Sequence, residues 1–194
     1  MTLAASNNSL TLLRKFKIRF NLGLRMTITV HQFTPSHDRQ RALRRAFGCF
    51  GTGVTVVTVQ TESGPMGMTA NSFSSVSLDP PLVLWSPSVH STRHDHFAHA
   101  DSFCIHVLAA DQLALAQRFA RFGTDFSDVD WVQGPVGAPR ISGCLAEFHC
   151  TLHALHPAGD HSLILGQVQH VMQNDTDAQG LLFEKGRFGS FSAH

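Results

Sequence analysis

Extended segments follow one another along most of this sequence, and helix-forming segments rarely come between them. Residues 54–59 are β-branched at almost every position, which is typical of a strand. A doubly wound parallel sheet needs a crossover helix between successive strands, and that regular alternation is missing. The sequence therefore predicts a mostly β protein: a mostly antiparallel barrel with a few peripheral helices.

The remaining elements can be placed from breakers and caps. Asp79-Pro80-Pro81 ends two extended segments within 66–78, because a residue before proline is pushed out of the helical region. Further strands are predicted at 82–86, 103–108, 144–155 and 163–172, with a last hairpin at 181–191. Short helices are predicted over 36–47, over 91–100 and after the cap Asp111.

Composition limits the function classes. The chain has 194 residues, enough for one domain, and 43% of them are hydrophobic, enough for a packed core. Only 15% are charged, against about 25% in an average domain, so a partner subunit or ligand is expected to cover part of the surface. The net charge of +1 gives no basic face for nucleic acid, and no apolar run reaches membrane-spanning length. The four cysteines form no C-x-x-C pair and are predicted to be reduced core thiols, as in a cytoplasmic protein.

The N-terminal residues differ from the rest. Residues 1–25 hold five of the 15 basic residues and no acid, so ten basic and 14 acidic residues remain in 26–194, a net charge of −4. A transit peptide is one reading of such a start. We favour a disordered basic extension over 1–33, or a true start at Met26, followed by one domain over 34–194.

Hydroxyl and amide side chains crowd into residues 67–83, although the flanks are strand-like. The six polar positions are Thr69, Asn71, Ser72, Ser74, Ser75 and Ser77. A buried hydroxyl without a partner costs about 1–3 kcal/mol, so these groups either face water or bind a polar ligand. Their density favours a wall of donors for a planar heterocycle and its phosphate, although a solvated strand face remains the alternative.

The next segment leads from Trp85 through Ser91 and Thr92 into a predicted helix. A helix N-terminus with hydroxyls beside it suits a phosphate, although an ordinary cap explains it equally well. Four histidines in this region have helical spacing, namely His90, His94, His96 and His99. No cysteine or glutamate completes a ligand set, so we predict no metal site.

The turn His156-Pro-Ala-Gly-Asp-His161 lies between two long predicted strands and presents Asp160 and His161 at its tip. A histidine there can donate to a developing anion or orient a ring, although bend residues alone explain the segment. Gly48–Gly53 matches neither a dinucleotide fingerprint nor a phosphate-binding P-loop, and no G-x-S-x-G elbow is present.

Three blocks in order, FGTGVTVVT from Phe50, GMTANSFSSVSLDPPLV from Gly67 and HPAGDH from His156, resemble the flavin reductase family over about residues 40–191. The resemblance implies a homodimeric antiparallel split β-barrel that binds FMN or FAD near the subunit interface. It also implies that NADH or NADPH delivers hydride to flavin N5 and that reduced flavin diffuses to a separate monooxygenase.

The resemblance further implies roles for individual residues. His161 is the expected catalytic residue. The other expected flavin or nicotinamide contacts are Thr69, Ala70, Asn71, Ser72, Val76, Ser77, Ser86, Ser91, Thr92, Phe119, Gly159, Asp160 and Phe188, with Arg93 or Arg118 beside the phosphate. Two alternatives remain: a flavin- or haem-binding carrier or sensor without nicotinamide turnover, and an oxidase that keeps its FMN.

Overall fold

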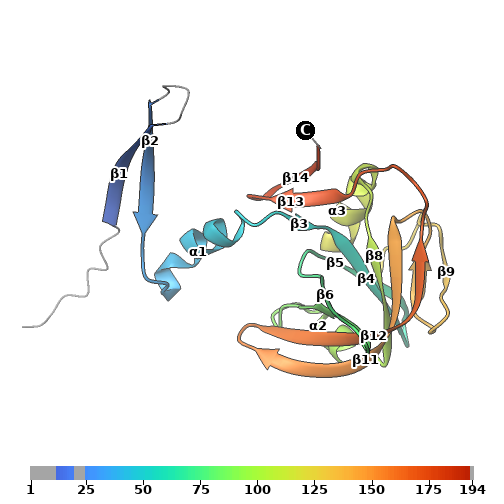
Figure 1. The fold of residues 1–194 in the computed structure, drawn as a ribbon. Coiled ribbons are helices and arrows are strands. Elements are labelled where there is room, and N and C mark those ends of the chain that lie inside the picture. Colours follow the sequence, from blue (N-terminus) through green and yellow to red (C-terminus); the bar gives the residue numbers. More distant parts are fainter. Residues whose placement is uncertain (1–11, 20–24, 193–194) are drawn as a thin grey trace, which may run out of the picture. The chain divides into compact units, whose positions relative to one another are not determined.

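The computed structural model describes residues 12–19 and 25–192, which divide between two compact units, 1–47 and 48–194 (Figure 1). This boundary falls after Phe47 instead of after residue 33, where the sequence predicted it. We describe each unit by itself.

The first unit contains a hairpin and two short helices. β1 (Leu12–Arg19) pairs antiparallel with β2 (Arg25–Gln32), and η1 (His37–Arg39) and α1 (Gln40–Phe47) follow. The sequence predicted a disordered extension here, but these described residues are paired strands. The reason is visible in the sequence, where charged and apolar residues alternate with strand periodicity from Lys15 to Arg19. Residues 1–11 and 20–24 of the predicted extension lie outside the described residues.

A seven-stranded antiparallel sheet forms most of the second unit. Its strand order is β5-β4-β8-β11-β12-β7-β6, and every neighbouring pair is antiparallel. The strands are β4 (Thr55–Thr61), β5 (Gly64–Ala70), β6 (Ser74–Leu78), β7 (Pro81–Trp85), β8 (Ser102–Val107), β11 (Ala146–Ala158) and β12 (His161–Gln173). The predicted mostly β, antiparallel fold is confirmed.

Smaller elements surround this sheet. β3 (Thr52–Gly53), β13 (Leu181–Glu184) and β14 (Arg187–Ser190) form a three-stranded sheet in the order β14-β13-β3, and β9 (Trp131–Gln133) pairs with β10 (Pro139–Ile141). The helices are α2 (His94–Ala98), η2 (Ala110–Gln112) and α3 (Leu113–Arg121), which packs on β4 and β5. Within the described ranges, no helix is long and apolar enough to cross a membrane.

Two hydrophobic clusters lie on opposite faces of β4, because successive side chains of a strand point to opposite sides. Val57 and Val59 belong to the cluster around Trp85 and Phe103. Val56 belongs to the second cluster, around Leu108, Phe119 and Leu181. Cys104, Cys144 and Cys150 are buried, as expected for core thiols, whereas Cys49 is exposed.

Candidate functional site

The end of β5 borders a shallow pocket of about 110 Å³, lined by Val54, Thr69, Ala70, Asn71, Phe183 and Phe188. Four of these residues, Thr69 to Asn71 and Phe188, were expected from the sequence to contact the flavin. Phe183 and Phe188 pair across the β13–β14 hairpin with ring centroids 4.9 Å apart. The pocket is smaller than the roughly 300–1,000 Å³ of most ligand sites, so it fits one edge of a ring system rather than a whole flavin.

Some of the predicted donors already have partners. The Thr69 hydroxyl donates to the carbonyl of Ala116 at 2.6 Å, and the Asn71 amide donates to Thr52 Oγ1 at 3.0 Å. The Thr69 hydroxyl therefore connects β5 to α3. A ligand can contact the backbone of Thr69, because its hydroxyl already has a partner.

Ser72 and Ser86 bind each other. The Ser86 backbone N–H donates to Ser72 Oγ at 2.9 Å, and the Ser72 hydroxyl donates to the Ser86 carbonyl at 3.2 Å. These two bonds join the end of β5 to the end of β7. The serine-rich segment and the predicted phosphate loop, which lie apart in the sequence, are thus neighbours.

The tip of the β11–β12 hairpin contacts the same loop. Val89 N donates to the Asp160 carbonyl at 3.0 Å, Ser162 N donates to the Pro87 carbonyl at 3.0 Å, and Ser88 forms a β-bridge with His161. Gly159 has a φ of +66°, which favours glycine and closes the tight turn. The hydrogen bonds between Ser72 and Ser86 and the bridge between Ser88 and His161 thus connect three segments: the residues that follow Thr69, the loop after β7, and the tip of the β11–β12 hairpin.

His161 and Asp160 form a pair at this tip. Asp160 Oδ1 lies 2.8 Å from His161 Nδ1, and the His161 side chain is 44% exposed. The hydrogen bond from His161 lowers the pKa of Asp160, so the carboxylate is retained to lower pH. A carboxylate on Nδ1 fixes the ring orientation, and Nε2 has no hydrogen-bond partner among the described residues.

The remaining expected contacts lie at the edges of this region. Val76 and Ser77 lie on the edge strand β6, where Val76 is 51% exposed. Ser91 Oγ accepts from Arg93 N at 3.2 Å, and Thr92 is exposed. α2 begins only at His94 and has five residues, so the expected phosphate contacts of Ser91 and Thr92 remain predictions.

Phe119 does not belong with the other expected contacts. Its side chain is fully buried, and its ring lies 4.8 Å from that of Phe126 in the second hydrophobic cluster. The apolar face of α3 turns this residue into the core, which leaves no surface for a flavin ring. The expectation that Phe119 flanks the flavin is therefore corrected.

Both arginines suggested for the phosphate have other partners. Arg93 Nη1 donates to the carbonyls of Gly67 at 2.9 Å and Phe119 at 2.7 Å, and burial lowers the pKa of Arg93. Arg118 donates to the carbonyl of Ser127 and lies 3.6 Å from Asp125. Both guanidinium groups thus donate hydrogen bonds to backbone carbonyls of the protein instead of facing an open phosphate site.

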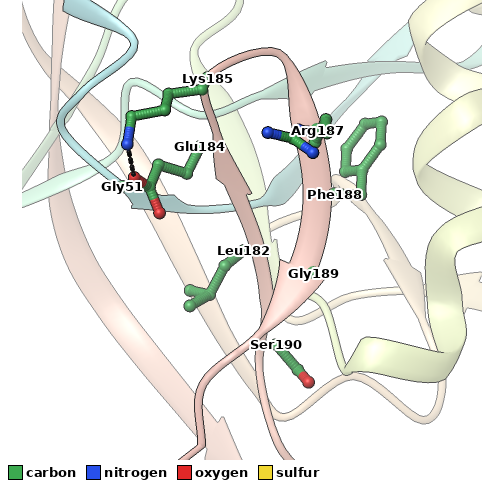
Figure 2. Close-up of a pocket in the computed structure, with 8 residues that line it drawn as sticks. All are labelled: Gly51, Leu182, Glu184, Lys185, Arg187, Phe188, Gly189 and Ser190. Carbon is green, nitrogen blue, oxygen red and sulfur yellow. Dashed lines mark ion pairs between the residues drawn. The ribbon is translucent and has the colours of Figure 1, made fainter.

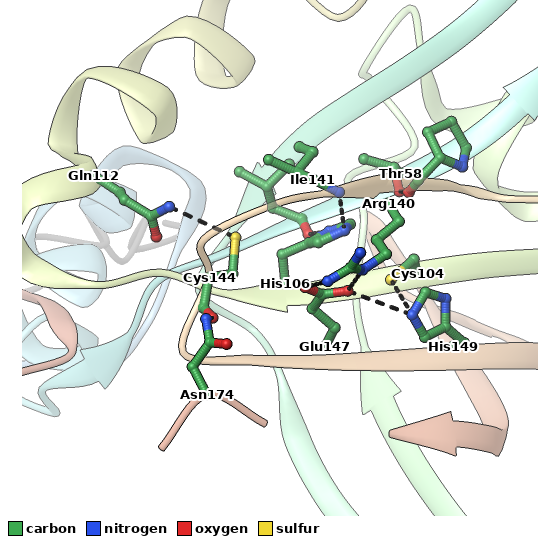
Figure 3. Close-up of polar contacts among 12 residues, drawn as sticks. Thr58, Cys104, His106, Gln112, Arg140, Ile141, Cys144, Glu147, His149 and Asn174 are labelled. Atoms are coloured by element: carbon green, nitrogen blue, oxygen red, sulfur yellow. Dashed lines mark hydrogen bonds and ion pairs between the residues drawn. The ribbon is translucent and has the colours of Figure 1, made fainter. Parts of the chain in front are cut away.

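A polar cluster that was not predicted from the sequence joins β10 to β8 and β11 (Figure 3). Arg140 Nε and Nη2 donate to the two oxygens of Glu147 at 2.6 and 3.2 Å, and Glu147 Oε2 lies 3.5 Å from His149 Nε2. His106 Nε2 accepts from Ile141 N at 3.0 Å, while its Nδ1 lies 3.0 Å from the Val56 carbonyl. These contacts attach β10 to the sheet. The sequence did contain a signal for this cluster: Glu147 and His149 occupy alternate positions of the predicted strand 144–155, so they share one face of it.

Cys104, Glu147 and His149 also hold three metal-ligating atoms close together. Arg140 already neutralises the Glu147 carboxylate through two hydrogen bonds, and burial raises the pKa of Cys104 far above its ordinary value. A cation beside a guanidinium group is unfavourable, and three ligands do not close a structural zinc site. The arrangement therefore fits a structural network.

Comparisons with known proteins agree with this geometry. The model of the flavin reductase like domain matches residues 47–192. FMN reductase (NADH) SmoA of Agrobacterium fabrum is 52% identical over 162 residues, 84% of this chain and 92% of that protein. The reductase component of the flavin-dependent trigonelline monooxygenase of Acinetobacter baylyi is 45% identical over 69% of this chain and 44% of that protein.

A solved structure is similar in both sequence and fold. It is the NADH:FAD oxidoreductase SgcE6 of Streptomyces globisporus in complex with NAD and FAD fragments, with a TM-score of 0.76 and 43% identity over 82% of this chain and 96% of that chain. The antiparallel sheet, the family match and these similarities together confirm the resemblance seen in the sequence. This chain is a member of the flavin reductase family.

Proposed function

We propose that this flavin reductase oxidises NADH or NADPH and reduces free FMN or FAD at the surface that runs from Thr69 to His161. The observation that carries the proposal is the series of contacts that brings Ser72, Ser86 and Asp160–His161 together beside the Thr69–Asn71 pocket. The flavin and the nicotinamide supply the redox chemistry. The protein positions the two rings and provides a donor where negative charge develops.

His161 is the proposed donor. Asp160 orients its ring, and Nε2 remains for the ligand. A histidine held in this way can hydrogen-bond the reduced flavin or orient the nicotinamide, and either role lowers the barrier more than it strengthens flavin binding. The remaining expected residues are proposed to line the surface on which the flavin and the nicotinamide bind. They are Thr69, Ala70, Asn71, Ser72, Val76, Ser77, Ser86, Ser91, Thr92, Gly159 and Phe188.

The test is steady-state oxidation of NADH and NADPH with FMN, FAD and riboflavin supplied in turn. His161→Ala should lower kcat by about 10- to 100-fold, while the Kd for flavin, measured by fluorescence quenching, changes much less. Exposed His153 provides the matched control His153→Ala, whose kcat should equal that of the wild type. A carrier or sensor would oxidise no nicotinamide with any flavin, and an oxidase would retain stoichiometric FMN after dialysis.

We further propose a homodimer that uses the edge of the main sheet. β6 is an edge strand on which Val76 is 51% and Leu78 97% exposed, and an exposed apolar edge favours association. Leu78→Glu should shift a dimer toward monomer in light scattering after size exclusion, whereas Glu62→Ala, at a hairpin turn, should not. A mass equal to one chain for the wild type would contradict the dimer.

A separate oxygenase is the proposed consumer of the reduced flavin, which leaves by diffusion because the site is shallow. Reduced buried thiols and dependence on a nicotinamide pool both support a cytoplasmic location. Purified protein with NADH and FMN should sustain a flavin-dependent oxygenase across a dialysis membrane. Loss of coupling across the membrane, under conditions where chemically reduced FMN added on the reductase side does sustain the oxygenase, would indicate direct transfer instead.

A further inference from the structure

A larger pocket of about 380 Å³ lies against the β13–β14 hairpin (Figure 2). This volume falls within the roughly 300–1,000 Å³ range of ligand sites. Its lining residues are Gly51, Leu182, Glu184, Lys185, Arg187, Phe188, Gly189 and Ser190. Only Phe188 was expected from the sequence to contact a ligand, and Phe188 also borders the smaller pocket beside Thr69–Asn71.

The three-stranded sheet β14-β13-β3 carries few side chains around Leu182. Leu182 pairs with Gly53 on one side and Gly189 on the other, so a glycine, a leucine and a glycine form one row across the three strands. A Cβ atom added at Gly53 or Gly189 would meet no atom within 4 Å. This row therefore leaves room for a flat ring over the Leu182 side chain.

Charged groups stand next to this row. Lys185 Nζ lies 3.1 Å from Glu184 Oε1, so these two charges compensate each other. Arg187, which pairs with Glu184 across the hairpin, has no hydrogen-bond or ion-pair partner among the described residues. The pocket thus keeps one uncompensated positive charge, on a group whose planar fork matches the oxygens of a phosphate.

We propose that this pocket binds the adenosine phosphate part of a nucleotide. Arg187 holds the phosphate, Leu182 and Gly189 support the adenine, and Glu184 accepts hydrogen bonds from ribose hydroxyls. The inference rests on the proposed function, because the proposed ligands are the nucleotides of that reaction. The Phe188 side chain points to the opposite face of the hairpin from Arg187 and Leu182, so the two pockets lie on either side of the edge strand β14, and the nucleotide passes around this edge. NADH, NADPH and FAD all carry an adenosine phosphate, whereas FMN and riboflavin do not.

The first test measures binding of ADP by calorimetry. Arg187→Ala should raise the Kd for ADP by about tenfold, as expected for loss of a charge-assisted hydrogen bond. Gly189→Ala should raise it similarly, because Gly189 lines the pocket and the added Cβ meets no protein atom within 4 Å. Arg121→Ala, at an exposed arginine on α3, is the control and should leave the Kd unchanged. Circular dichroism checks that each variant folds.

The second test identifies which nucleotide uses the pocket. If NADH does, Arg187→Ala raises the KM for NADH with FMN, FAD and riboflavin alike. If FAD does, it raises the KM for FAD and leaves the KM for FMN unchanged. Either result supports the inference. ADP binding that is absent in the wild type or unchanged in Arg187→Ala overturns it, and so does a rise in KM for FMN without one for FAD or NADH.

Failure of this inference is distinguishable from failure of the proposed function. Reduced nicotinamide mononucleotide and riboflavin both lack an adenosine phosphate, so their turnover depends on the redox site alone. Arg187→Ala should leave this reaction unchanged, and His161→Ala should slow it. Absence of NADH and NADPH oxidation with every flavin in the wild type counts against the proposed function, whereas ADP binding is measured independently of turnover.

Discussion

His94 Nε2 lies 2.9 Å from the hydroxyl of Ser162, the residue that follows His161. The other ring nitrogen, Nδ1, lies 2.8 Å from Asp95 Oδ1. A histidine considered at first as part of a surface cluster thus connects α2 to the start of β12. Since His161 precedes Ser162 in the strand, we expect this contact to hold the backbone that carries the proposed catalytic side chain.

Loss of that contact should affect turnover more than flavin binding. His94→Ala is expected to lower kcat by about tenfold through misplacement of His161, with the Kd for FMN unchanged. Ser162→Ala should have the same effect, and the double variant should be no worse than either single variant. The control His96→Ala replaces an exposed histidine of the same helix. Additive losses in the double variant would contradict a shared contact.

Arg93 is expected to matter for stability instead of phosphate binding. Its guanidinium donates to the carbonyls of Gly67, Phe119 and Ala120. Arg93→Ala should lower the free energy of unfolding by about 3 kcal/mol, since it leaves carbonyls without donors. Urea denaturation measures this, with Arg121→Ala as the control. A stable variant with a greatly raised KM for FMN would instead restore the phosphate role.

Stability should fall in mild acid because of His106. Burial lowers the pKa of this residue from 6.5 to about 4. Between these values the unfolded chain binds a proton and the folded chain does not, so stability is lost as the pH falls through this window and levels off below about pH 4. The loss attributable to His106 is about 3 kcal/mol. Urea midpoints measured across the window should follow this curve.

Replacement of His106 separates its titration from other groups. His106→Leu should be less stable near neutral pH, because leucine forms a hydrogen bond with neither Val56 nor Ile141. Its stability should then vary less with pH between about pH 6.5 and 4 than that of the wild type. His149, whose pKa burial also lowers, contributes in the same direction. Identical pH slopes for the two proteins would exclude His106 as the source.

Phe119 provides a test of the corrected assignment. Since its ring is fully buried, Phe119→Leu should lower the free energy of unfolding by about 1–2 kcal/mol. The Kd for FMN, measured on folded protein, should stay the same. Phe188→Leu is the contrasting variant, because Phe188 is 39% exposed and borders both pockets, and it should weaken binding with little loss of stability. A reversed pattern would return Phe119 to the flavin site.

The strands and most of the helices followed from local sequence. β-branched runs, prolines and glycines act within a few residues, so the segments 54–59, 144–155 and 181–191 were found as strands close to their observed bounds. The β1–β2 hairpin was not predicted, because an acid-free basic segment is typical of a disordered extension. The serine-rich segment and the His161 turn were singled out from their residue types, and the structure places them in contact through Ser86 and Ser88.

Tertiary structure alone decided which side chains remain for a ligand. The family resemblance implied that Phe119 flanks the flavin and that Arg93 or Arg118 lies beside its phosphate. Burial of Phe119 and hydrogen bonds from both arginines to backbone carbonyls commit these side chains to the protein itself. The same packing leaves Arg187 without a partner in the described chain, beside a row of glycines. Residue type and spacing thus determined the fold class and the chemistry of the polar segments. Partner and exposure depend on contacts between residues distant in sequence, which local patterns do not encode.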